Sequence, residues 1–186
     1  MNPDWTVLLI YSPPDDDGSV TNMWTKEVLV SIREFEQDVL KSDEYKGTCL
    51  AVDQGDSFPC NPEGFLTVLD FFESPADLET YTDAQIQQAL VDVIDDPKKW
   101  KAYKSLFDND VQESKQVKMM RSILSQAGPV KDGDKRYSNI SEDETEQDKV
   151  QTEFQKSLRD RAESGDERYA KIKTRVFGRL LFDVLF

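Results

Sequence analysis

The stretch Trp24–Leu40, WTKEVLVSIREFEQDVL, is the clearest helix signal in the chain, and the fold prediction starts from it. Apolar residues recur along it at spacings of three to five, which is the pattern of one buried helical face. They are Trp24, Val28, Leu29, Ile32, Phe35, Val39 and Leu40. Thr25 is a favourable N-cap, because its hydroxyl can accept a hydrogen bond from a backbone N–H that otherwise lacks a partner. The stretch therefore predicts a helix over Thr25–Leu40.

Two short apolar segments flank this helix. Trp5–Tyr11 (WTVLLIY) precedes it and Gly47–Val52 (GTCLAV) follows it, and both are rich in residues that favour strands. A strand, a long helix and a second strand predict a βαβ unit on which the rest of the chain packs.

The middle of the chain is predicted to be mainly helical. Asn61–Phe72 (NPEGFLTVLDFF) begins like a helix at Asn61-Pro62, but its composition also fits a strand. Thr82–Ile94 has Thr82 and Gln85 at capping-box spacing ahead of an apolar stripe. Asp96–Phe107 predicts a further helix, and Asp108–Glu113 a loop. The aromatic side chains of that helix are expected in the core rather than around a ligand; they are Trp100, Tyr103 and Phe107.

The last third returns to strand and helix. Gln116–Ala127 predicts a strand that ends at Gly128-Pro129, and Lys131–Gln147 an acidic loop. Asp148–Glu163 predicts a helix with a narrow buried stripe of Val150, Phe154 and Leu158. Ala170–Phe177 alternates charged and less polar residues, as a half-buried strand does.

Together these segments predict an α+β fold, a ferredoxin-like split βαβ sandwich with a helical insertion in the middle. We expect one domain over residues 1–186, with a first βαβ half at 1–55, the insertion at 61–112 and a second half at 115–186. The apolar end of the chain, RLLFDVLF, leads us to expect that this domain is cut from a longer protein.

The composition excludes several functions. The 186 residues are 38% hydrophobic and 32% charged, as in a globular domain. The net charge of −14 argues against binding to nucleic acid or anionic membranes, which attract basic surfaces. No run approaches the roughly 20 apolar residues of a membrane span, so the chain itself is expected to be soluble. The absence of histidine removes the commonest general base and metal ligand, and we assign no catalytic, metal or cofactor residues.

Two cysteines and one glycosylation sequon bear on the compartment. Cys49 and Cys60 could form a disulfide that closes a short loop, or they could be free thiols of a cytosolic protein. A disulfide would imply an oxidising compartment. Asn139 lies in the triplet Asn139-Ile140-Ser141, which is a weak signal alone but agrees with that compartment.

Other charged groups have simpler interpretations than ligand sites. Asp15–Asp17 lack the alternating spacing of a calcium loop and fit a solvated turn. The positive side chains of Lys171–Arg179 fit the solvent face of an edge strand better than a phosphate site. An enzyme that uses two carboxylates is a third possibility, and its first candidates are Asp70 and Glu73 beside Phe71 and Phe72.

Three segments carry a resemblance to a known family. WTKEVLVSIREFEQDVL, with Tyr45 and Cys49 after it, resembles the first large extracellular loop of Dispatched- and Patched-like proteins, which belong to the resistance–nodulation–division (RND) transporters. Met120–Val130 resembles the family's strand that ends in a Gly-Pro turn, and Ala170–Phe186 its return strand towards the second membrane helix.

The resemblance implies a non-catalytic porter domain on the extracellular or lumenal face of a multi-pass membrane protein. Its partner would be the rest of its own transporter, and its cargo a lipid, a sterol or a lipidated protein. The alternative is a free-standing acidic protein-binding module. The two differ in geometry, because a domain held between two membrane helices must bring both of its ends to one side.

Overall fold

The computed structural model describes residues 6–14, 22–49, 60–61, 64–126 and 144–178, and its centre is a four-stranded sheet. The strands are β1 (Thr6–Ser12), β2 (Phe65–Leu66), β3 (Met120–Ser125) and β4 (Lys173–Phe177). They lie in the order β2-β3-β1-β4, and every neighbouring pair is antiparallel. The chain is therefore an α+β fold, as the sequence predicted.

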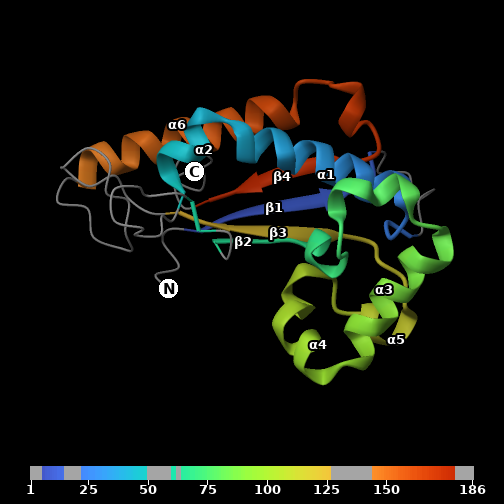
Figure 1. Cartoon of the computed structure of the whole chain (residues 1–186). Helices are drawn as coiled ribbons and strands as arrows, with labels where there is room; N and C mark the ends of the chain where they lie inside the picture. The colour runs from blue at the N-terminus through green and yellow to red at the C-terminus, as the bar shows by residue number, and fades with distance from the viewer. Residues whose placement is uncertain (1–5, 15–21, 50–59, 62–63, 127–143, 179–186) are drawn as a thin grey trace.

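Helices lie on both sides of this sheet (Figure 1). One side carries α1 (Lys26–Lys41), α2 (Asp43–Thr48) and α6 (Glu144–Ala162). A smaller helical group lies beyond one end of the sheet on the other side: α3 (Asp83–Asp95), α4 (Pro97–Tyr103) and α5 (Val111–Ser114). Short 3₁₀ helices connect these elements in the described part of the chain: η3 (Val68–Phe71), η4 (Pro75–Thr80), η5 (Lys104–Leu106) and η6 (Glu167–Tyr169).

Helix α1 forms where its apolar pattern predicted it. The Thr25 hydroxyl accepts a hydrogen bond from the backbone N–H of Val28, at 3.4 Å, and caps the helix. The predicted inner face is buried, with one exception. Leu40 is 38% exposed, and it borders a cavity described below.

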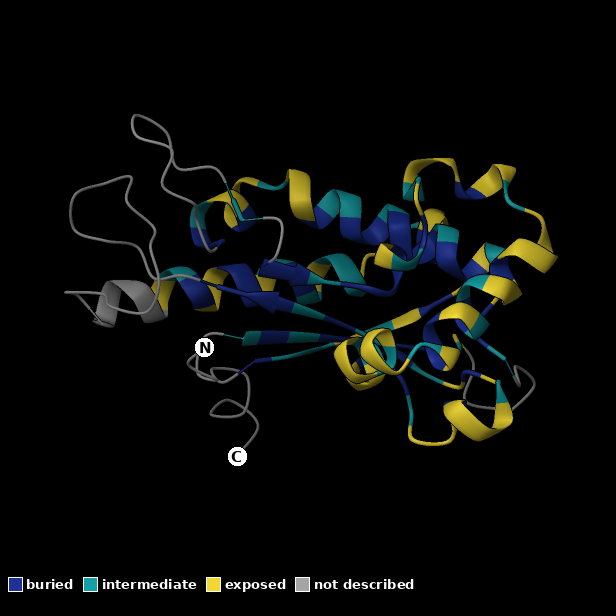
Figure 2. Cartoon of the chain, turned by 60° about the horizontal axis from the view of Figure 1, so that its bottom comes forward, coloured by how far each residue is buried: buried dark blue, intermediate teal, exposed yellow. Residues whose placement is uncertain are grey.

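The core lies between the sheet and the helices, where buried residues gather in Figure 2. Alternate residues of β1 face α1, and Val7, Leu9 and Tyr11 are fully buried. Trp24 joins this core to the smaller helical group: its indole N–H donates to the carbonyl of Ile86 at 2.7 Å. Its ring also packs on three phenylalanine rings, Phe71, Phe72 and Phe107. Trp24 is a core anchor, as predicted, and Trp5 lies outside the described residues.

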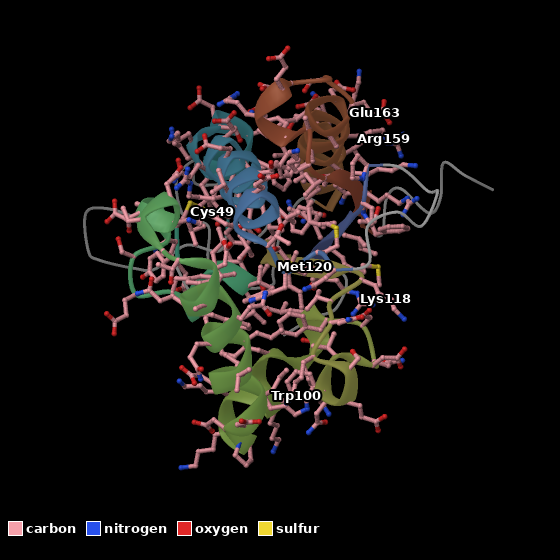
Figure 3. The ribbon with its side chains drawn as sticks, turned by 90° about the vertical axis from the view of Figure 1, so that its right-hand side faces the viewer. Cys49, Trp100, Lys118, Met120, Arg159 and Glu163 are labelled. Carbon is pink, nitrogen blue, oxygen red and sulfur yellow. A yellow bond between two sulfur atoms is a disulfide. The ribbon has the colours of Figure 1, made fainter. Side chains whose placement is uncertain are left out.

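Helices α3 and α4 of the smaller group confirm their sequence signals. Thr82 and Gln85 form the capping box at the start of α3, and Asp96 caps α4 through the backbone N–H groups of Lys98 and Lys99. Trp100 packs on Phe107 with ring centroids 6.1 Å apart, and Figure 3 shows it among these helices. These aromatic side chains therefore hold the helical group together.

One predicted strand is wrong. Gly47 and Thr48 end α2, and Cys49 makes an isolated β-bridge with Gln126, so the predicted strand Gly47–Val52 is absent over its described part. Local contacts favour the helix, because Ser42 caps it and buried Tyr45 packs on Phe154 of α6. The strand that enters the sheet is instead β2, within the stretch that fitted either helix or strand.

Several boundaries also differ from the predictions: β3 covers only Met120–Ser125 of the predicted Gln116–Ala127, and α4 ends at Tyr103, before Phe107. Helix α5 begins at Val111, inside the predicted loop Asp108–Glu113, and α6 begins at Glu144, inside the predicted acidic loop. Strand β4 covers Lys173–Phe177 only, because η6 occupies the residues before it. The strand lies at the sheet edge with exposed Lys173 and Arg175, as predicted for that basic segment.

The outer edge of β3 is covered by three short pieces of chain. Strand β2 pairs with Leu124 and Ile123, Cys49 bridges to Gln126, and Phe107 bridges to Met120. A disulfide between Cys49 and Cys60, with Cα atoms 5.5 Å apart, joins the piece that contains Cys49 to the segment that leads into β2. The crosslink therefore fastens two of the three covering pieces to each other.

Replacing both cysteines by serine should lower the free energy of unfolding by about 2–3 kcal/mol, because the unfolded chain regains the entropy of the closed loop. Urea denaturation of the two proteins measures this difference. A reducing agent should lower the stability of the natural chain by a similar amount and leave the double variant unchanged. Equal stabilities without reductant would contradict a crosslink in the folded protein.

Candidate functional site

Two cavities lie on the side of the molecule where α1 meets the segment from Phe65 to Tyr81. The smaller cavity, of about 590 Å³, lies between α1, α2, β2 and the helices η3 and η4. The larger, of about 810 Å³, lies between η3, η4, α3 and α4. Asp70 borders both cavities.

A buried carboxylate, Glu36 of α1, borders the smaller cavity and is 2% exposed. Its Oε1 accepts hydrogen bonds from the Tyr11 hydroxyl at 2.9 Å and the Ser122 hydroxyl at 2.5 Å. The Thr67 hydroxyl lies 2.8 Å from Oε2 and 3.0 Å from Oε1. One side chain of α1 thus contacts β1, β3 and the residue that follows β2.

The surroundings of Glu36 oppose its ionisation. Burial raises the pKa of this carboxyl to about 7, although the hydroxyls of Ser122, Thr67 and Tyr11 partly offset the effect. The nearby negative charge of Asp70 also contributes to this raised pKa. Glu36 in turn adds to the effect of burial in raising the pKa of Tyr11 well above its ordinary value. Glu36 therefore changes charge near neutral pH.

Arg33, one turn before Glu36, clamps α1 to η4. Its guanidinium donates two hydrogen bonds to the Glu79 carboxylate, at 2.5 and 2.7 Å, and one to the Ala76 carbonyl at 2.9 Å. It also donates to Glu34 at 2.7 Å. These bonds lower the pKa of Glu79 to about 2. The Nε–H of Arg33 is buried and has no hydrogen-bond partner within the described part of the chain, and Arg33 borders the smaller cavity.

The remaining wall of the smaller cavity is mainly apolar. Leu40, Tyr45, Phe65, Leu69 and Pro75 contribute most of it, with Cys60 of the disulfide beside them. Of the polar residues that border the same space, Glu36, Arg33 and Thr67 are buried. The others are Gln37, Lys46, Asn61 and Asp70. An apolar cavity with a few buried polar groups is the usual form of a small-molecule site.

The larger cavity holds the carboxylates that the sequence singled out. Asp70, Glu73, Phe71 and Phe72 all border it, together with Asp77 and Asp92. Partial desolvation raises the pKa of Asp70, although its side chain is exposed, and the Thr67 N–H bond opposes this shift. Two aromatic pairs stand at its wall, Phe71 with Tyr103 and Phe72 with Tyr81. The sequence thus identified one cavity wall, although it gave no sign that Asp70 also borders a second cavity.

Sequence reasoning missed Glu36. The sequence feature that could have identified this buried carboxylate is its position. Glu36 lies one residue after Phe35 and four after Ile32, on the face of the helix predicted to be buried. Of the other candidates, Cys49 and Cys60 form the disulfide, whereas Asn139 and Asp15–Asp17 lie outside the described residues. Within the described ranges, no group of three histidine, cysteine or acidic residues is arranged to hold a metal ion.

Comparison with known proteins adds no relative: no family model matches the chain, and neither a curated protein nor a solved structure is significantly similar to it. The site must therefore be interpreted from its own chemistry.

Two observations bear on the compartment. The disulfide indicates an oxidising environment such as the cell exterior. Over the described residues, no helix has both the length and the apolar character needed to cross a bilayer.

Glu36→Gln should remove a pH dependence of stability. The pKa of Glu36 is higher in the folded state than in the unfolded chain, so its contribution to stability is complete below about pH 4.5 and is lost as the pH rises through about 7. At about pH 8 the free energy of unfolding of the variant should exceed that of the natural chain by up to about 3 kcal/mol. Near pH 5 the two proteins should be about equally stable. Thermal unfolding between these pH values measures the difference.

Glu73→Gln is the matched control, because it neutralises an exposed carboxylate at the other cavity and should leave the slope with pH unchanged. Parallel pH profiles for the natural chain and Glu36→Gln would show that Glu36 does not titrate in this range. Acidic groups whose pKa is lowered in the folded state, such as Glu79, titrate below this pH range. They therefore do not change the difference in stability between the natural chain and the variants.

Proposed function

We propose that this chain is a non-catalytic porter domain of an RND-type transporter similar to the Dispatched and Patched proteins. The domain stands on the extracellular or lumenal face of a multi-pass membrane protein. It contributes to a passage for a lipid, a sterol or a lipidated protein, or docks a partner there. The rest of the transporter is its permanent neighbour.

The observation that carries this proposal is the position of the first and last strands. Leu8, near the start of β1, pairs directly with Phe177, the last residue of β4. Because β1 and β4 are antiparallel, the chain enters the one and leaves the other at the same end of the sheet. A domain that is held by both ends at one membrane needs this geometry.

The strand order supports a ferredoxin-like split βαβ sandwich. Helix α1 lies between β1 and β2 in the chain, and β3 separates these two strands in the sheet. Likewise α6 lies between β3 and β4, and β1 separates them. The predicted first half at 1–55 is too short to hold its second strand, because β2 lies at Phe65–Leu66, inside the predicted insertion at 61–112. In this proposal the first βαβ half therefore extends to β2, the insertion follows it up to residue 112, and the second half is at 115–186.

The sheet face turned away from α1 offers a surface for the neighbouring parts of a transporter. A row of partly exposed apolar residues crosses all four strands there: Leu66, Ile123, Leu8 and Phe177. Arg121 and Arg175 stand next to this row, opposite Ile10. An apolar row with a positive border suits docking to another protein domain.

The larger cavity favours a second candidate, an acidic protein-binding module that acts on its own. Asp70, Glu73, Asp77 and Asp92 give its wall an excess of negative charge over Lys99. The aromatic side chains beside them could contact a basic segment of a partner. This function needs no membrane, so the location of the domain in the cell distinguishes it from the porter proposal.

The location is testable in the full-length protein that the natural gene encodes. In intact cells, Lys98→Cys should react with a maleimide that cannot cross membranes, because Lys98 is exposed on α4. The gene should also encode apolar stretches of about 20 residues on both sides of this region.

Leu90→Cys is the matched control, since this position is 1% exposed, borders neither cavity and should react only after denaturation. A lumenal domain would react only after the internal membranes are opened as well. Reaction of Lys98→Cys once the plasma membrane alone is permeabilised, with the internal membranes intact, would place the domain in the cytosol and contradict the porter proposal. A gene without flanking apolar stretches would do the same and would favour the free-standing module.

A further inference from the structure

We infer that the smaller cavity is a binding site for an apolar primary amine, whose ammonium group pairs with Glu36 and whose hydrocarbon part fills the apolar wall. The site is defined by the residues of the cavity itself. It stands whether or not the domain belongs to a transporter.

The first reason is that Glu36 has no cationic partner among the residues that the structure describes. The groups that approach its carboxylate most closely are the neutral hydroxyls of Tyr11, Thr67 and Ser122. A buried carboxylate without a positive partner is costly, and it either binds a proton or gains from a cation that reaches it. An ammonium group that enters the cavity supplies such a cation.

The charged and titratable side chains around Glu36 do not take this role. On α1, Arg33 is already bonded to Glu79 and Glu34. On α2, Lys46 is exposed and paired with Asp43 at 3.5 Å, and Tyr45 is neutral. After β2, Asp70 is negative and raises the pKa of Glu36. On β1 and β3, the facing groups are the neutral Tyr11 and Ser122.

The second reason is the unpartnered Nε–H of Arg33. This donor is buried, in a side chain that is 6% exposed, and the side chain borders the same cavity as Glu36. A buried donor without an acceptor costs about 1–3 kcal/mol. A ligand with a hydroxyl or carbonyl oxygen beside its amine supplies an acceptor for it. The site therefore favours an amino alcohol over a simple amine.

The third reason is the apolar part of the wall. Phe65 and Leu69 form its buried side, and Leu40 stands at the border with 38% of its surface exposed. Leu40 is the one large apolar side chain classed as exposed among the residues that the structure describes. A hydrocarbon chain in this cavity would cover it and gain about 25 cal/mol for each Å² of apolar surface removed from water.

The intact, disulfide-bonded chain can be tested with three probes that share one eight-carbon tail: octylamine, 1-octanol and octanoate. Isothermal titration calorimetry should show saturable binding of octylamine and weaker or undetectable binding of the other two. Octylamine should bind about tenfold more tightly near pH 8 than near pH 5.5, because only ionised Glu36 attracts it. 2-Amino-1-octanol should bind more tightly than octylamine, through its hydroxyl and Arg33.

Variants locate the ammonium group. Glu36→Gln should weaken octylamine binding at least about tenfold and remove its pH dependence, whereas the control Glu73→Gln should leave both unchanged. Asp70→Asn separates the two carboxylates that border the cavity. Loss of binding in Asp70→Asn with normal binding in Glu36→Gln would overturn the assignment to Glu36.

Other outcomes would overturn the inference as a whole. Equal binding of octylamine and 1-octanol would show that the cavity recognises only the hydrocarbon tail, and absence of saturable binding would show that no amine site exists. If Glu36→Gln does not fold, carbon-13 NMR of the natural chain gives the answer. Octylamine should lower the titration midpoint of the Glu36 carboxyl, and an unchanged midpoint would overturn the pairing.

Discussion

The hydrogen bonds of Glu36 are the interaction on which the rest of this structure depends. A single carboxylate links α1 to β1 and β3 and to Thr67, which follows β2. Thr67 also caps η3, where its hydroxyl accepts from the N–H of Leu69. The position of the helix over the sheet and the course of the chain after β2 are therefore both fixed by this buried carboxylate. Arg33 and Glu79 fasten the preceding turn of α1 to η4.

Burying the Glu36 carboxylate at this position costs free energy at neutral pH. Burial favours the protonated form of Glu36, whereas three hydroxyls support the ionised form, and the balance leaves its pKa at about 7. A purely structural link could use a neutral amide at the same position. The carboxylate therefore makes both the packing of α1 and the charge of the smaller cavity sensitive to pH.

Residue patterns were enough to predict most of the helices and the general fold class. The periodicity of α1, the capping box of Thr82 and Gln85 and the alternation in β4 depend on neighbouring residues, so they are visible in the sequence. The strand expected at Gly47–Val52 failed because contacts between Tyr45 and Phe154, over 100 residues apart, favour a helix there. Glu36 was missed for the same reason: its hydroxyl partners come from three distant segments, and no local pattern brings them together.

The divided cover on the outer edge of β3 has a consequence for association with other chains. Before Cys49 and Cys60 are joined, two of the three covering segments are held on this edge by noncovalent contacts alone. Uncovered strand edges invite pairing with other chains. Oxidation of the two thiols therefore turns a reversible cover into a permanent one and protects this edge from pairing with a second molecule.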